Sequence, residues 1–392
     1  MDVKQIAALM NGVTTEILGE GSVVNEDLTN VVDIGKAIFD NTSYDHFVKT
    51  LVDHIGRMIF VDRKYNGNTL ALYRDAWEYG AVMEKVYGIK LPEATENESW
   101  ELSDGVSYDP NIFTKPEVAA KFYNKRVTFE VPLSIADRQA RSAFDSAGQL
   151  NAFVSMLWND VDKSMEVKQE SLASRTVNSF IASTIAAEFP SVADNDYSAS
   201  TGVKAVNLLL EYNTLFSGAT TTKDACLYNP EFIRYATLRI TKTIDRLTRL
   251  NSLFNIGGIP RFTPKDKQHI ILLSDFKRAS DVYLQSDTFN DQYTSLPLAT
   301  EVPYWQGAGT GYALSSVGNV HATVENGDST KEINIGHVLG VVFDHDACGI
   351  TNLDRRVTSN YNAKAEFTNY WTKLDAGAFR DHNEQFVVFF VA

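Results

Sequence analysis

The sequence predicts an α+β protein, and three observations support this prediction. Residues 147–189 carry apolar side chains at the three- and four-residue spacing of one very long helix. A segment with alternating apolar residues, 126–131, comes before this helix and is typical of a half-buried strand. Helix-like and strand-like segments then alternate after residue 202. A long helix between strand-like segments indicates a strut in a mixed domain rather than a coiled coil.

The composition is that of a folded protein and excludes several functional classes. A net charge of −14 argues against direct wrapping of nucleic acid, because neutralising phosphates requires clustered Lys and Arg. No apolar run reaches the length that spans a membrane, and the first residues lack the pattern of a signal peptide. We therefore expect a protein made in the cytoplasm. The two cysteines, Cys226 and Cys348, are too few for a disulfide framework.

The first 128 residues show no pattern that predicts a core of their own. Residues 1–57 form short amphipathic helical pieces, which must dock on something larger, such as another subunit. Residues 58–128 are more irregular and contain an acidic stretch without any base, formed by Glu93, Glu96, Glu98, Glu101 and Asp104. This stretch has two interpretations, a solvated loop or an extended arm whose charges meet neighbouring copies.

The strand and the long helix have recognisable ends. Pro132 is expected to end the strand 126–131, and Ser134 with Asp137 resembles a capping box that begins a short helix over 134–144. A second capping box, Ser146 with Gln149, is expected to begin the long helix, which Pro190 closes. Without a break this helix would extend roughly 64 Å.

The second half of the chain predicts a mixed body without internal repeats. Its expected helices are 203–216, 229–250 and 275–284, and its expected strands are 269–273, 320–324, 333–343 and 385–391.

One face of the expected helix 229–250 is basic. Arg239, Lys242, Arg246 and Arg249 are spaced three and four residues apart, while Phe232, Leu238, Ile240, Ile244 and Leu247 can cover a core. A solvated face is one interpretation. Our hypothesis is that these bases, and the acidic residues Glu93, Glu96, Glu98 and Glu101, make contacts between copies of the chain.

Three short motifs carry residues found in catalytic or metal sites. The glycine-rich stretch 307–311 lacks the Lys-Ser/Thr of a phosphate loop, so we read it as a turn. The stretch 344–348, Asp-His-Asp-Ala-Cys, has no second cluster to complete a metal site. The stretch 381–384, Asp-His-Asn-Glu, offers carboxylates and a histidine for acid–base work, but solvated turn residues explain it more simply. We expect no catalytic residue, cofactor or bound metal.

Three stretches resemble a known family. They are 129–144 before the long helix, 269–291 with its strand, helix and "QSDTF" tail, and 354–390 at the end of the chain. Together with the order of elements, they resemble the major capsid proteins of tailed bacteriophages, whose fold is named for phage Hong Kong 97.

The resemblance implies a domain layout and a function. It implies an N-terminal arm (1–57), an extended loop (58–128), a peripheral domain with the spine helix (129–202, joined by strands of 351–392) and an axial domain (203–350). It also implies a non-enzymatic virion protein, assembled in the host bacterial cytoplasm into the hexamers and pentamers of an icosahedral shell. That shell would enclose double-stranded DNA, with scaffold and portal proteins as partners.

Two alternatives remain open at this point. One is an encapsulin-like shell of the same fold, whose interior would hold a cargo enzyme. The other is a soluble hydrolase that uses the residues of 344–348 or 381–384.

Overall fold

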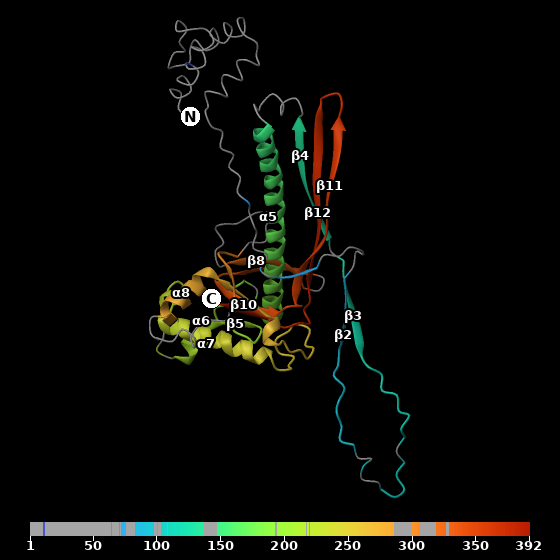
Figure 1. Ribbon diagram of the computed structural model, residues 1–392. Helices are drawn as coiled ribbons and strands as arrows, with labels where there is room; N and C mark the ends of the chain where they lie inside the picture. Colours follow the sequence, from blue (N-terminus) through green and yellow to red (C-terminus); the bar gives the residue numbers. More distant parts are fainter. Residues whose placement is uncertain are drawn as a thin grey trace. The chain divides into compact units, whose positions relative to one another are not determined.

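The computed structural model separates the chain into two compact units (Figure 1). Unit 1 contains residues 1–66, 130–166 and 355–373, and unit 2 contains residues 67–129, 167–354 and 374–392. The structure describes residues 83–97, 103–107, 109–124, 126–136, 147–192, 194–216, 220–285, 299–305, 319–326 and 329–392, together with residues 11, 64, 70, 72–75, 100 and 218. Apart from residue 11, the expected N-terminal arm therefore lies outside the described residues, and so does the stretch 307–311.

A five-stranded sheet forms the centre of unit 2. Its order is β5–β13–β10–β6–β7, with β10 antiparallel to both β13 and β6 and the two outer pairs parallel. The strands are β5 (Ala205–Asn207), β6 (Gln268–Leu273), β7 (Thr300–Val302), β10 (Val338–Asp344) and β13 (Phe386–Phe390).

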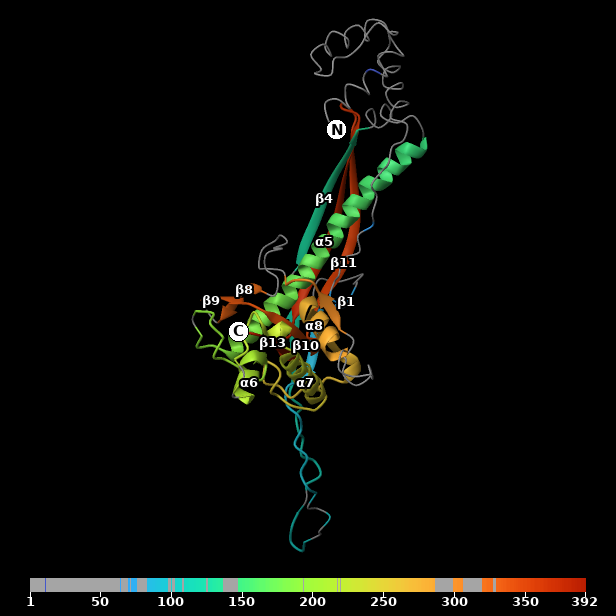
Figure 2. The same ribbon diagram turned by 90° about the vertical axis from the view of Figure 1, so that its left-hand side faces the viewer.

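Both faces of this sheet are buried, which explains why its strands read as continuous apolar runs. Phe386, Val388 and Phe390 of β13 belong to one core cluster, which also contains the C-terminal half of helix α5. The intervening Val387 and Phe389 belong to a second cluster with helices α6, α7 and α8. Alternate side chains of β13 thus pack on opposite faces of the sheet, as the two-residue period of a strand requires. Figure 2 shows the three short helices together beside the strands.

The helices of the second cluster have clear caps. Helix α6 spans Leu208–Leu215 and α7 spans Pro230–Leu247. The Asn207 and Asn229 side chains accept hydrogen bonds from the first-turn amides of these helices, and Pro230 occupies the first turn of α7. Helix α8 spans Ser274–Gln285. Leu238 of α7 is exposed, so its expected place in the core was wrong.

Helix α5, Ala147–Glu188, is 42 residues long, and its observed ends agree with the local signals in the sequence. A helix of that length extends about 63 Å. Its C-terminal half packs into unit 2, where Val177, Phe180, Ile181 and Ile185 have no exposed surface, while Arg175 is exposed. Burial of most of its surface explains why this half carries so few charges.

Unit 1 is built from the N-terminal part of α5 and parts of three strands, which lie side by side in both views. Strands β4 (Arg126–Ala136), β11 (Cys348–Asn362) and β12 (Phe367–Arg380) belong to a sheet of order β1–β11–β12–β4, where β1 spans Tyr73–Asp75. In this unit the Trp158 ring of α5 meets the Tyr370 ring of β12 edge to face, with centroids 5.4 Å apart.

Strand β4 corrects two expectations. It continues through Pro132, because β4 is an edge strand and a proline on an edge need not interrupt the hydrogen bonds of the sheet. Ser134 belongs to this strand rather than to a helix cap, and its hydroxyl donates to Asn369 Oδ1 at 2.6 Å. The expected run 333–343 is also divided, into β9 (Ser329–Ile335) and β10, by a break at His337, whose φ is 53°.

Candidate intersubunit interface

A two-stranded hairpin occupies the middle of the region expected to be an extended loop. Strand β2 (Met83–Gly88) pairs antiparallel with β3 (Val118–Tyr123), and Lys85 lies opposite Lys121. Alternate residues on each strand are half-buried and exposed. One face of the hairpin therefore meets the body of unit 2, and the other face is open.

Ion pairs fasten the inner face of the hairpin to the segment just before β13. The Lys85 ammonium lies 2.8 Å from both the Asp381 and the Glu384 carboxylates, and Lys121 lies 3.4 Å from Asp381. The side-chain amide of Asn383 also donates a hydrogen bond to the Tyr87 hydroxyl at 2.7 Å. Residues of 381–384 thus hold both strands of the hairpin.

The charges at this base are stabilised by their partners. Burial alone would raise the pKa of Asp381, but the hydrogen bond and the charge of Lys85 lower it below the ordinary value. Burial alone would lower the pKa of Lys85, yet its bonds to Asp381 and Glu384 raise it. Both groups are charged at neutral pH. The interpretation of 381–384 as a solvated turn was therefore wrong, because Asp381 has a fully buried side chain.

The distal part of the hairpin exposes large apolar side chains. Trp100 and Phe113 are each 84% exposed and Ile112 is 76% exposed. Glu93, Glu96 and Asp104 are exposed beside them, whereas Glu98 and Glu101 lie outside the described residues. Such a surface is unfavourable in water and is typical of a segment that is covered by a partner.

The basic face of α7 is real, but one of its members is used within the chain. Arg239 donates to both oxygens of Glu211 in α6, at 2.8 and 3.2 Å. Lys242 and Arg246 of α7 are exposed, and so is Arg249, which follows the end of the helix at Leu247. These three residues remain candidates for contacts between copies, while Arg239 joins two helices of one copy.

The motif 344–348 also has a structural role. Asp344 accepts a hydrogen bond of 2.7 Å from the Thr263 hydroxyl, and His345 Nδ1 lies 2.7 Å from His269 Nε2. Cys348 is buried, and burial raises the pKa of its thiol. Within the described part of the chain, no group of three or more His, Cys, Asp and Glu side chains is placed to hold a metal ion. None of the described helices is long and apolar enough to cross a membrane.

Comparisons with known proteins agree with this geometry. The model of a family described as Phi29-like phage major capsid protein matches residues 7–390. The capsid structure of Staphylococcus phage Andhra contains a similar chain, with a TM-score of 0.53 and 10% identity over 86% of this chain and 87% of that chain. A structure of head fiber and inner core protein of native bacteriophage P68 contains another, with a TM-score of 0.55 and 9% identity over 86% and 87%.

These likenesses differ in what they establish. At such low identities the two solved structures concern the fold alone, and with the family match they confirm the predicted α+β capsid fold. A comparison with curated proteins gave no match.

Proposed function

The chain belongs to the Phi29-like phage major capsid protein family, and we propose that it assembles by burying its exposed surfaces in contacts with further copies of itself. Membership makes it a major capsid protein, a structural and non-enzymatic component of the phage head. This confirms the function that the resemblance implied and argues against the soluble hydrolase.

The observation that carries the proposal is the contrast between the two ends of the β2–β3 hairpin. Its base is fixed by Lys85 and Lys121 to a buried carboxylate, so the hairpin has a defined origin. Its distal part, with Trp100, Ile112 and Phe113, is exposed in a single chain. A segment that is anchored at one end and uncovered at the other is suited to a contact with a second subunit.

The strands of unit 1 support the same mechanism. In the described residues, β4 is an edge of its sheet, and the end of β11 and the turn that follows it are exposed from residue 355 to residue 366. An edge strand offers unpaired backbone groups that another chain can use. Long strands without a covered face gain stability when other subunits pack against them.

The proposal includes the domain layout that the family resemblance implies. We assign residues 1–57 to an arm, 58–128 to an extended loop, 129–202 and 351–392 to a peripheral domain, and 203–350 to an axial domain. Copies arranged through these parts would form the hexamers and pentamers of an icosahedral shell.

The proposed partners extend beyond the chain itself. A shell of this kind would enclose double-stranded DNA without reading its sequence, and the net charge of −14 fits a surface that does not hold the genome tightly. Scaffold and portal proteins are the other proposed partners, and the host bacterial cytoplasm is the proposed place of assembly.

Negative-stain microscopy of the full chain, expressed with and without its neighbouring phage genes, tests the proposal. We expect closed shells, tubes or capsomer rings in at least one of the two preparations. A chain that stays monomeric in both would contradict the proposal. Double-stranded DNA inside particles purified from infected cells would support a phage head, whereas a protein cargo would support the encapsulin-like alternative.

A further inference from the structure

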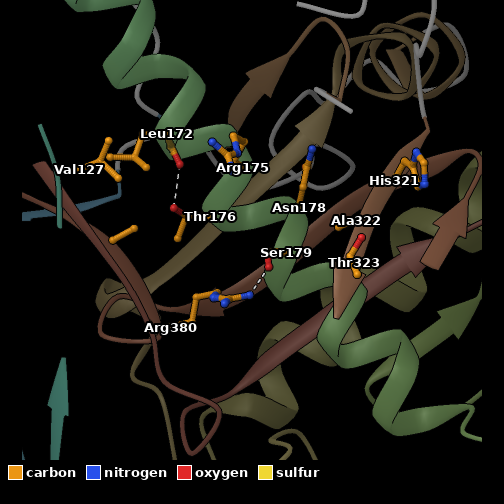
Figure 3. A pocket seen from close by; sticks show the side chains of 11 residues that line it. Val127, Leu172, Arg175, Thr176, Asn178, Ser179, His321, Ala322, Thr323 and Arg380 are labelled. Carbon is orange, nitrogen blue, oxygen red and sulfur yellow. Dashed lines mark hydrogen bonds between the residues drawn. The ribbon is translucent and has the colours of Figure 1, made fainter. Parts of the chain in front are cut away.

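A pocket of about 410 Å³ lies in unit 2 beside the C-terminal half of α5 (Figure 3). Polar side chains reach it from three elements: Arg175 and Ser179 from α5, His321 and Thr323 from β8 (Val320–Asn326), and Arg380 from β12. The rest of its wall is formed by the apolar residues Val127, Leu172, Ala322 and Ala378 together with Thr176 and Asn178.

Neither arginine of the pocket makes an ion pair with a residue that the structure describes, whereas His321 pairs with Glu332. The Arg380 guanidinium donates a hydrogen bond to the Ser179 hydroxyl, and Glu325 adds a favourable charge without an ion pair. Arg175 is exposed and makes no hydrogen bond or ion pair with any residue that the structure describes. A guanidinium has five N–H donors, so most donors of these two arginines are available for an anion.

The chemistry of the wall limits which anion fits. The planar fork of Arg matches a carboxylate, which it can bind through two parallel hydrogen bonds. A small inorganic anion would leave the apolar side of the pocket uncovered. The volume lies within the range of about 300–1,000 Å³ that is usual for ligand pockets. The pocket therefore fits a carboxylate next to a bulky apolar side chain.

The chain carries a segment with this composition. Residues 91–114 contain six carboxylates and no Lys or Arg. Trp100 lies in this segment, between Glu98 and Glu101 in the sequence, and is 84% exposed. Tryptophan is among the residues that contribute most to protein interfaces when they become buried in a pocket.

We propose that the pocket beside α5 receives Trp100 and a neighbouring carboxylate of residues 91–114 from a second copy of the chain. This inference rests on the proposed function and names the site that receives the distal hairpin. A second copy is the occupant because β2 and β3 are fixed to their own body at Lys85 and Lys121, while Trp100 stays exposed in the single chain.

A double-mutant cycle on the full chain tests this contact. The critical concentration for assembly would be measured by light scattering for the wild type, Trp100→Ala, Arg175→Gln and the double variant. We expect each single change to raise the critical concentration about tenfold or more, as for a residue at the centre of an interface. If the two side chains meet, the double variant should assemble about as well as the worse single variant.

Controls separate the contact from general effects. Trp100→Phe keeps an aromatic ring and should restore most of the assembly. Arg278→Gln removes another exposed arginine of unit 2 and should leave the critical concentration unchanged. Because Trp100 and Arg175 are exposed, the unfolding midpoint of the unassembled variants should equal that of the wild type.

Several outcomes would overturn the inference. Additive effects in the double variant, or no effect of either change, would show that the two residues do not meet. An Arg175→Gln variant that forms empty shells normally but retains less DNA would assign the pocket to phosphate instead. A wild-type chain that never assembles would remove the proposed function as well, so the two failures are distinguishable.

Discussion

The Lys85 ammonium and the Asp381 carboxylate lie 2.8 Å apart, although 296 residues separate them in the sequence. The Asp381 side chain is fully buried and that of Lys85 is four-fifths buried. If one of the two charges were removed, water could not solvate the other adequately. The pair joins the base of the hairpin to the segment just before β13 of the unit 2 sheet. We therefore regard it as the contact that sets where the hairpin leaves the body.

Replacement of Asp381 by Ala should destabilise the chain strongly. It leaves the Lys85 ammonium with Glu384 as its remaining carboxylate partner, and breaking a buried pair by removing one charge costs about 3 kcal/mol or more. Urea unfolding of the unassembled chain, followed by tryptophan fluorescence, would measure the loss. Lys265→Ala is the matched control, because the Lys265–Asp245 pair is exposed and should contribute less than about 1 kcal/mol. Equal losses in both variants would contradict a special role for the buried pair.

Acid should destabilise the same region through His382. Burial, with the positive charges of Lys121 and Arg380, lowers the pKa of His382 from 6.5 to about 4. Between these values the unfolded chain binds the proton and the folded chain does not, so the free energy of unfolding falls as pH falls from 6.5 to 4. Unfolding curves at pH 7 and pH 5 should show a smaller loss for His382→Gln than for the wild type. An identical loss in both proteins would mean that folding does not lower the pKa of His382. The pKa of Asp381 is lowered from 3.8, so its contribution to the free energy of unfolding is lost only as the pH falls below that value. This lies outside the range from pH 7 to pH 5.

Two bases on one helix should behave differently when their charge is reversed. Arg239→Glu places two carboxylates together at Glu211 and should destabilise the folded chain by at least about 2 kcal/mol. Arg246→Glu changes an exposed residue, so it should leave unfolding nearly unchanged but raise the critical concentration and alter its dependence on salt. Assembly and its salt dependence that stay the same in Arg246→Glu would refute the hypothesis of a basic interface on α7.

The sequence predicts the elements whose signals are local. Helix α5 ends within one residue of the prediction because Pro190 terminates it, and β6 and β13 follow from short apolar runs. Ser134 shows the limit of local signals, because its spacing to Asp137 fits a capping box while its actual partner, Asn369, comes from another strand. Tertiary pairing overrode the local preference.

The interface could be predicted only in part, for a related reason. The acidic composition of 91–114 is visible in the sequence, and so is the basic face of α7. The anchoring of Lys85 by Asp381 is not, because nothing in either segment specifies a partner hundreds of residues away. The same holds for Arg239, whose carboxylate partner Glu211 belongs to another helix. The sequence does not show whether a charged residue is solvated or paired, because only the fold brings its partner close.

The stacked pair of Phe180 and Phe386 should be a centre of stability for unit 2. Their ring centroids lie 4.0 Å apart, and both side chains are buried between α5 and the five-stranded sheet. Phe180→Ala removes this contact and leaves a cavity in a layer that cannot easily collapse, so we expect a loss of about 3–5 kcal/mol in urea unfolding. Phe262→Ala, which truncates a phenylalanine that is 55% exposed, should cost less than about 1 kcal/mol. Comparable losses would mean that α5 is held by other residues. A large loss at Phe180 alone would show that α5 is fixed to the sheet before any second copy binds, as a pocket formed partly by α5 requires.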